Sequence, residues 1–104
     1  MLKIQEKETQ DTFLKATEIW GLEGQVRQFM EECAEGVVAA NKYFFRGYPV
    51  QVIATEIADI EIMCSQMRQV IGDEVVDFEI NEKLTRLKAR LELAEYRMGK
   101  KNES

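Results

Sequence analysis

The sequence of 104 residues contains no histidine, and this absence excludes several kinds of chemistry. Without imidazole there is no Ser-His or Cys-His nucleophile pair, no His-ligated zinc and no histidine general base. Acidic residues outnumber basic ones by 19 to 14, which gives a formal net charge of −5. Such a surface is poorly suited to tracking nucleic-acid phosphates, so we expect no nucleic-acid partner. A phosphate-bearing ligand would need a metal ion between itself and the protein.

Cysteine and long apolar runs are also scarce. The two cysteines, Cys33 and Cys64, are too few for a disulfide framework and lack metal-site spacing. Both fall on apolar helical faces, which predicts reduced core residues. The charged start of the chain has no apolar segment of a signal peptide, and no apolar run approaches the ~18 residues of a membrane span. We therefore expect a cytoplasmic protein without a membrane partner.

One proline and six glycines are too few turn breakers for a β-sandwich. They divide the chain into four predicted helices, over about 3–20, 23–45, 49–71 and 73–98. Pro49 suits the first turn of the third helix, and Asp73 suits the N-cap of the fourth. The segment 75–80 resembles a strand in composition, but no partner strand exists elsewhere. The prediction is an all-α fold with one domain over 1–104, in which 99–104 is a frayed tail.

The fourth predicted helix carries an apolar seam whose members step by four and three residues in turn, as in a heptad repeat. Its members are Ile80, Leu84, Leu87, Leu91, Ala94 and Met98. The seam fits either packing inside the chain's own bundle or an interface between subunits. Because a chain of this length has a small core, we expect a homodimer or homotetramer assembled through its helices.

Acidic residues recur at i,i+3 spacing six times, so this spacing alone indicates little. Most pairs have Lys or Arg three or four residues away, as on a solvated helix face, or lie at a helix N-terminus. Two pairs have neither explanation: Glu32 with Glu35, and Glu56 with Asp59. Glu56 falls inside the apolar stripe of the third helix, and Asp59 lies at the edge of that stripe.

On the second helix, the two glutamates flank a predicted apolar stripe. The stripe consists of Val26, Phe29, Cys33, Val37, Ala40 and Phe44, and the surface beside the glutamates consists of Gln25, Gln28, Gly36 and Ala39. The short turn over 46–49 makes the second and third helices antiparallel, which brings the two acidic pairs to a similar level.

Four converging carboxylates would repel one another and lose hydration, at a cost of several kcal/mol each. A hard cation such as Mg²⁺, or Mn²⁺, resolves this conflict through all-oxygen ligation. The alternative is a set of carboxyls with raised pKa and Arg partners from elsewhere. A ferritin-like di-iron site is excluded because it needs Glu-x-x-His.

Three segments resemble a known family: WGLEGQ at 20–25, EECAE at 31–35 and EIADI at 56–60. They are similar to the MazG-like all-α nucleoside triphosphate pyrophosphohydrolases, whose signature is EExxE followed by ExxD. NEKLTR at 81–86 is similar to a later N-x-K-hydrophobic-x-R stretch, and the resemblance spans about 20–90. It implies an oligomeric four-helix MazG-like bundle. It also implies Mg²⁺-dependent attack of water on the α-phosphate of a (deoxy)nucleoside triphosphate, releasing a monophosphate and pyrophosphate for nucleotide-pool house-cleaning.

The resemblance also implies roles for individual residues. The metal ligands would be Glu32, Glu35, Glu56 and Asp59. Catalysis would involve Glu31, as a water-orienting carboxylate, together with Glu35. The phosphates would be held by Asn81, Lys83 and Arg86. Two of these have a second reading, because Glu79–Lys83 and Glu82–Arg86 have the spacing of surface ion pairs.

Trp20 lies just before the acidic helix, where its ring would stack on a nucleotide base. The alternative is a core anchor, which a lone tryptophan at a helix end more often is. Two other functions stay open on the sequence alone: a non-catalytic helical dimerisation module, and hydrolysis of another phosphate anhydride such as a phosphoribosyl-linked nucleotide. The unpaired Glu56 within an apolar stripe favours an enzyme, because a scaffold has no use for it.

Overall fold

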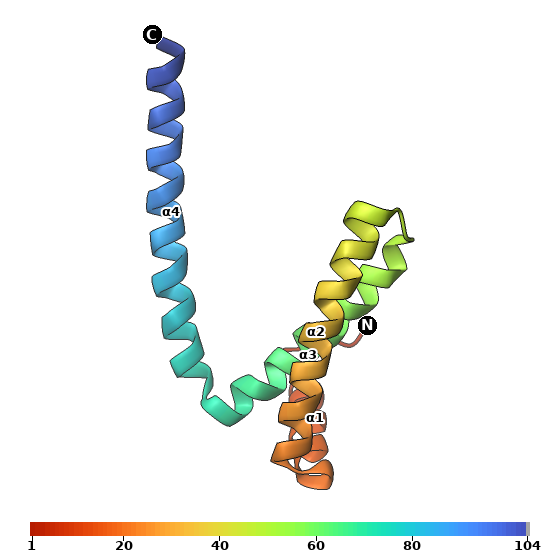
Figure 1. The fold of residues 1–104 in the computed structure, drawn as a ribbon. Coiled ribbons are helices and arrows are strands. Elements are labelled where there is room, and N and C mark those ends of the chain that lie inside the picture. The colour runs from red at the N-terminus through yellow and green to blue at the C-terminus, as the bar shows by residue number, and fades with distance from the viewer. Residues whose placement is uncertain (104) are drawn as a thin grey trace. The chain divides into compact units, whose positions relative to one another are not determined.

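The computed structural model describes residues 1–103 and contains four α-helices (Figure 1). They are α1 (Lys7–Trp20), α2 (Leu22–Arg46), α3 (Val50–Ile71) and α4 (Asp73–Glu103). No strand occurs in the described part of the chain, and the segment 75–80 is helical. The predicted all-α class is therefore confirmed.

Several predicted helix limits need correction. α1 begins at Lys7 rather than near residue 3, because Glu6 is extended (φ −69°, ψ 145°). Pro49 lies before α3 rather than in its first turn, and Asp73 is the first residue of α4 rather than its cap. α4 also continues past the predicted end near residue 98, as far as Glu103. A single glycine at position 99 does not end this helix, since good helix formers lie on both sides of it. Ser104 lies outside the described residues.

Glycines with positive φ mark the three breaks between helices. Gly21 (φ 83°) separates α1 from α2, Gly47 (φ 74°) ends α2, and Gly72 (φ 110°) lies between α3 and α4. Residues other than glycine rarely adopt these backbone φ angles. After Gly47, the Tyr48 N–H donates to the Lys42 carbonyl at 3.1 Å, which closes the end of α2.

The chain divides into two compact units, 1–70 and the part from residue 71 onward. In the first unit α2 and α3 lie side by side, and α1 is joined to α3 by amide side chains. The Gln10 Nε2 donates to Ser65 Oγ at 3.0 Å, and the Gln69 Nε2 donates to the Gln10 carbonyl and Oε1 at 2.9 Å. The contact between α1 and α3 thus includes a network of amide hydrogen bonds.

The interior of the first unit is small and polar for a helical hairpin. Its buried hydrophobic residues are Phe13, Ala39, Ile53 and Met63, and its buried polar residues are Gln25, Glu32, Ser65 and Gln66. The predicted apolar stripe of α2 is not the buried face, because Val37 is 73% and Phe44 67% exposed.

The physical reason is the close approach of the two helices. A Cβ built on Gly36 would lie only 2.5 Å from Ile60 Cδ1, so α3 packs on the small residues of α2. The prediction that both cysteines are core residues is also wrong. Cys33 is half-buried and Cys64 is exposed, so neither is a core residue, although both thiols are free as expected.

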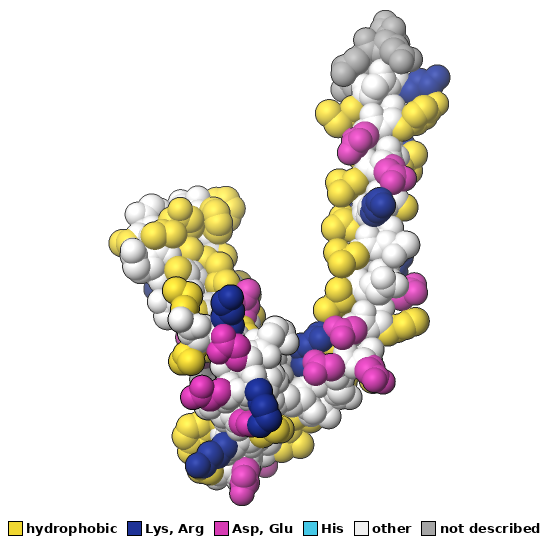
Figure 2. All heavy atoms as spheres, turned by 180° about the vertical axis from the view of Figure 1, so that it is seen from behind, with side chains coloured by type: hydrophobic (Ala, Val, Ile, Leu, Met, Phe, Trp, Pro, Cys, Tyr) yellow, Lys and Arg dark blue, Asp and Glu magenta, His cyan; other side chains and the backbone are white. Residues whose placement is uncertain are grey.

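The second unit contains α4. Along it the seam residues of the predicted heptad pattern are all exposed, and the large ones range from 44% for Ile80 to 65% for Met98. Figure 2 shows hydrophobic side chains following the length of this helix. Across residues 1–103, no helix combines the length and the apolar character needed to cross a bilayer.

Candidate metal centre

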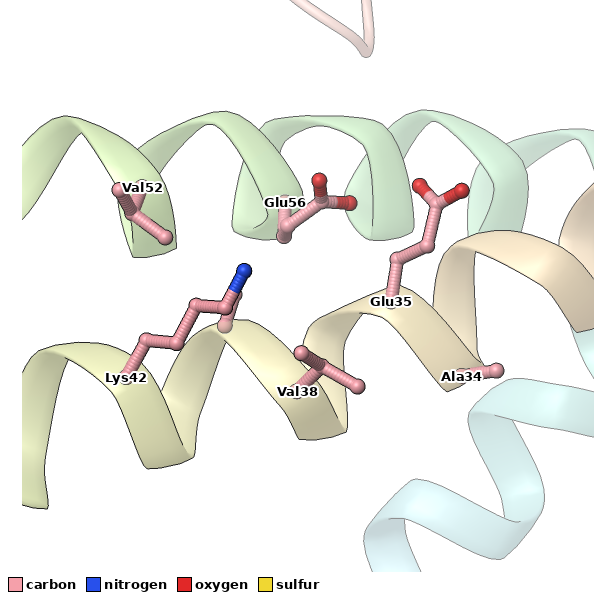
Figure 3. Close-up of a pocket in the computed structure, with 7 residues that line it drawn as sticks. Ala34, Glu35, Val38, Lys42, Val52 and Glu56 are labelled. Carbon is pink, nitrogen blue, oxygen red and sulfur yellow. The ribbon is translucent and has the colours of Figure 1, made fainter. Parts of the chain in front are cut away.

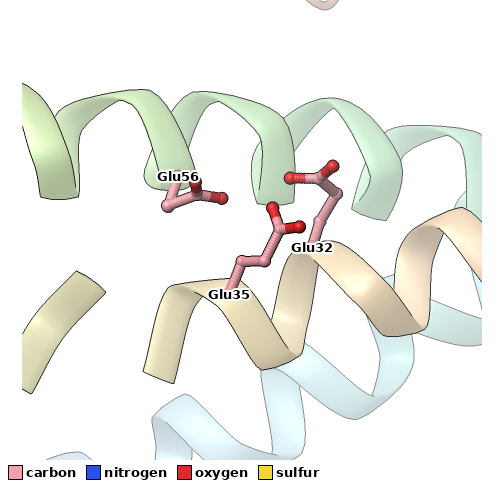
Figure 4. Close-up of side chains that lie close together, drawn as sticks. All are labelled: Glu32, Glu35 and Glu56. Atoms are coloured by element: carbon pink, nitrogen blue, oxygen red, sulfur yellow. The ribbon is translucent and has the colours of Figure 1, made fainter. Parts of the chain in front are cut away.

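Three carboxylates from two helices converge in the first unit. Glu32 and Glu35 come from α2 and Glu56 from α3, and one oxygen of each lies within 4.8 Å of the others (Figure 4). The predicted meeting of the acidic pairs is therefore confirmed for these three residues. Asp59 lies one turn along α3 from Glu56 and is close enough to Glu32 for that carboxylate to raise its pKa. We call Glu32, Glu35, Glu56 and Asp59 the acidic cluster.

Glu32 is the most deeply placed member, with 8% of its surface exposed. Its Oε1 accepts a hydrogen bond from Gln28 Nε2 at 2.7 Å. Its Oε2 is buried without a partner among the described residues, and so is Oε2 of Glu56. Buried carboxylate oxygens nearly always have a hydrogen-bond or ionic partner. Two orphaned oxygens at one place thus leave lone pairs that either a proton or a cation could occupy.

The electrostatics of the cluster lead to the same view. Loss of hydration is the largest cause that raises the pKa of Glu56, followed by the charge of Glu35 and by the contact with Glu32. Burial is also the main cause that raises the pKa of Asp59, followed by Glu32. In the described part of the chain no Lys or Arg lies within 4.0 Å of a cluster carboxylate. The alternative of Arg partners from elsewhere has no support within these residues, so either protons or a cation must offset the repulsion.

The donor set fits a hard divalent cation. All donors are carboxylate oxygens, as Mg²⁺ and Mn²⁺ prefer, and among the described residues no histidine or cysteine joins this group to favour a softer metal. The Gln28 hydrogen bond fixes one oxygen of Glu32 and leaves the other without a partner among the described residues. Such support by a neighbouring hydrogen bond is typical of metal-ligating carboxylates.

A cavity of about 310 Å³ adjoins the cluster on the side of the α2–α3 turn (Figure 3). It is lined by Ala34, Glu35, Val38, Ala39, Lys42, Val52 and Glu56. The Lys42 amine points between the two helices, toward α3. The sequence interpretation missed Lys42, although its position seven residues after Glu35 places both on one face of α2.

A second cavity, of about 510 Å³, adjoins Glu32 through Gln28. Its lining consists of Trp20, Gly24, Gln25, Gln28, Ile62, Met63 and Gln66. Trp20 is 70% exposed, so it is not a core anchor. An exposed indole that lines a cavity rich in amides is suited to contact a planar, hydrogen-bonding group.

The other predicted site residues do not belong to these cavities. Glu31 is exposed on α2, one turn before Glu35. The predicted phosphate ligands are all exposed on α4, in the unit from residue 71 onward: Asn81, Lys83 and Arg86. Among the described residues, Lys83 and Arg86 do not form the i,i+4 ion pairs that their spacing allows. Both side chains thus have their full donor capacity.

The chemistry of the site depends on these two features, the orphaned oxygens of the cluster and the lysine across the adjoining cavity. Together they form a place where a cation and an anion can bind side by side, which is the requirement for a metal–phosphate ligand. Comparison of the chain with known protein families, with curated proteins and with solved structures finds no match.

Proposed function

We propose that this chain is a Mg²⁺-dependent nucleoside triphosphate pyrophosphohydrolase that acts on the cytoplasmic nucleotide pool. The observation that carries the proposal is the buried Glu32, whose Oε2 is unpartnered and whose carboxylate lies beside those of Glu35 and Glu56. Without a bound cation, the repulsion and lost hydration of these carboxylates lower the stability of the fold. A divalent ion bound there would offset part of this negative charge and could also bind a phosphate oxygen. The MazG-like resemblance of the EECAE and EIADI segments supports the same reaction.

The reaction is the cleavage of one phosphoanhydride bond. The oxygen of water attacks the α-phosphorus, the bond from that phosphorus to the α–β bridging oxygen breaks, and pyrophosphate leaves. Mg²⁺, when held by the cluster, supplies neutralisation of phosphate charge and a lowered pKa for water. Because phosphoryl transfer needs positioning and charge stabilisation rather than a covalent nucleophile, the lack of histidine is no obstacle.

The other steps of the proposed reaction depend on residues of this chain. Glu32, Glu35, Glu56 and Asp59 hold the ion. Glu31 is exposed one turn from Glu35, where its carboxylate can orient water and accept its proton.

We infer that the working form is an oligomeric MazG-like helical bundle. Only Phe13, Ala39, Ile53 and Met63 are buried hydrophobic residues in the described chain, and no large side chain is fully buried. The α4 seam and the outer face of α2, with Val37 and Phe44, expose apolar surface that association would cover. In such an assembly Asn81, Lys83 and Arg86 would supply donors to the substrate phosphates.

Product analysis tests the proposed reaction. The native chain is incubated with Mg²⁺ and each of the eight common ribo- and deoxyribonucleoside triphosphates, and pyrophosphate and orthophosphate are measured separately. We expect pyrophosphate and the monophosphate from at least one of them, and no reaction in EDTA. Release of orthophosphate instead would refute the assignment.

A helical interaction module is the second candidate, and the exposed α4 seam is the observation that favours it. It predicts no turnover of any phosphate anhydride, including phosphoribosyl-linked nucleotides. It leaves the orphaned oxygens of Glu32 and Glu56 unexplained. For this reason we prefer the enzyme.

A further inference from the structure

We propose that the substrate binds along the α2–α3 pair in a single orientation. Lys42 binds its pyrophosphate half, and the Trp20 cavity receives its nucleoside half. This inference rests on the proposed function and adds the residues that orient the substrate. It assigns Lys42 as a residue that touches the leaving group.

The order of residues along the two helices places the acidic cluster between the cavities. On α2, Gln25 and Gln28 of the Trp20 cavity precede Glu32 and Glu35, and Lys42 follows them. On the antiparallel α3 the order is reversed: Val52 of the Lys42 cavity precedes Glu56, and Ile62, Met63 and Gln66 of the Trp20 cavity follow it. A nucleotide whose α-phosphate lies at the cluster therefore has one half on each side.

The two linings differ in charge. Lys42 is the one Lys or Arg that lines either cavity within the described residues. Among the described residues, none that lines the Trp20 cavity is charged. Its polar groups are the Trp20 indole and the amides of Gln25, Gln28 and Gln66. The terminal phosphates carry most of the substrate's negative charge, whereas a base is planar and offers hydrogen-bonding groups. The Lys42 ammonium is thus suited to bind the phosphates, and the Trp20 indole together with the glutamine amides is suited to bind the nucleoside.

Lys42 is held in place without being neutralised. Its Nζ lies 5.4 Å from the centroid of the Tyr48 ring, a cation–π contact, and its carbonyl accepts the Tyr48 N–H. No carboxylate of the described residues lies within 4.0 Å of this ammonium, although Glu35 and Glu56 line the same cavity. The cavity therefore has a positioned cation at one end and carboxylates at the other.

The spacing along α2 agrees with this assignment. Lys42 is the seventh residue after Glu35, a rise of about 10 Å along the helix axis. Helical side chains lean toward the N-terminus of their helix, so the Lys42 amine reaches back toward Glu35 (Figure 3). An anion bound at the cluster and extending toward the α2–α3 turn would meet this amine.

The test uses the two products, because they bind without turnover. Calorimetry measures the affinity of pyrophosphate and of each nucleoside monophosphate in Mg²⁺, and of Mn²⁺ alone. The proteins are the native chain, Lys42→Met, Lys42→Arg and the control Lys15→Met on the exposed face of α1. Trp20 is the sole tryptophan, so its fluorescence reports which product reaches its cavity.

We expect Lys42→Met to weaken pyrophosphate binding about tenfold or more, as for loss of a charged hydrogen bond, while Lys42→Arg retains most of it. Monophosphate affinity stays unchanged, and Mn²⁺ alone binds as tightly as before or more tightly, because a nearby positive charge is gone. Trp20 fluorescence responds to a monophosphate and not to pyrophosphate. Lys15→Met binds every probe as the native chain does.

Three results would overturn the inference while leaving the proposed function intact. They are unchanged pyrophosphate affinity in Lys42→Met, equal weakening of the monophosphate, and equal weakening of Mn²⁺, which would show a structural role. If the native chain binds neither product in Mg²⁺, the proposed function itself fails and this inference fails with it.

Discussion

Gly36 lies against the end of the Ile60 side chain, at a distance that leaves no room for a Cβ. A Cβ on Gly36 would be 2.5 Å from Ile60 Cδ1. The residue before this glycine is Glu35, so the close approach of α2 and α3 and the convergence of the carboxylates occur at the same level. The separation between Glu35 and Glu56 thus depends on a residue without a side chain.

This contact predicts that the effect of one substitution on the free energy of unfolding changes sign when the other residue is also substituted. Ile60→Val removes Cδ1 and should cost about 0.5–1.5 kcal/mol in the native chain. Gly36→Ala gains about 1 kcal/mol of helix propensity but forces overpacking that costs about 1–3 kcal/mol. On the Gly36→Ala background, Ile60→Val should stabilise the protein, because it removes the atom that the new methyl meets. Urea unfolding of the four proteins measures this coupling. Additive free energies would show that α2 and α3 do not meet here.

The pH dependence of stability should identify the cluster. The pKa values of Glu56 and Asp59 are raised above their ordinary values of 4.5 and 3.8. The folded chain therefore binds more protons than the unfolded chain between these values and the raised ones. Without metal, stability should fall as the pH rises through this window, so Tm should be higher near about pH 5 than near neutrality. A metal-free Tm that decreases from neutrality to about pH 5 would contradict the raised values.

Mg²⁺ should reverse this trend. It binds the ionised cluster, so the rise in Tm that it causes should be largest near neutrality and should shrink toward about pH 5. Thermal melting in EDTA and in saturating Mg²⁺ at several pH values gives both curves. A Mg²⁺-induced rise that does not depend on pH would place the ion elsewhere.

Glu56→Gln should abolish activity and leave the metal-free fold at least as stable as the native one. The substitution removes a metal ligand worth several kcal/mol in the transition state, so the rate should fall about a hundredfold or more. It also removes a charge that the cluster repels. Glu61→Gln is the matched control, since Glu61 is exposed on the same helix. A large drop in Tm for Glu56→Gln in EDTA would show that Glu56 has a structural ionic partner instead.

Association should be measurable in solution. The apolar seam on α4 and the small core predict a dimer or tetramer, and sedimentation equilibrium that gives 12.1 kDa at high micromolar concentration would refute this. Mixing Glu56→Gln chains with Lys83→Ala chains tests whether Lys83 acts across an interface. Regained activity in the mixture would place Lys83 at a neighbour's site, and no return would place it within its own chain.

Much of this architecture could be predicted from the sequence. Glycines at 21, 47 and 72 determine where the helices separate, because they adopt positive φ angles. The convergence of Glu32, Glu35 and Glu56 followed from a short turn and from the absence of basic neighbours. Both arguments use local rules, which act within a few residues along the chain.

The face of α2 that packs against α3 could not be predicted in the same way. Hydrophobic periodicity selected the face with Val37 and Phe44, whereas α3 packs on the face with Gly36 and Ala39. The tightest contact between helices favours small side chains, and the most apolar stripe is available for other surfaces. Lys42 was missed for a related reason, because its role depends on a cavity between two helices.

The position of bond cleavage tests the central claim most directly. The native chain is supplied with Mg²⁺ and its preferred nucleoside triphosphate in ¹⁸O-labelled water, and the products are analysed by mass spectrometry. If water attacks the α-phosphorus beside the cluster of Glu32, Glu35 and Glu56, the label should appear in the nucleoside monophosphate, and pyrophosphate should be unlabelled. Label in pyrophosphate or in orthophosphate would contradict the account, because water would then have attacked a different phosphorus.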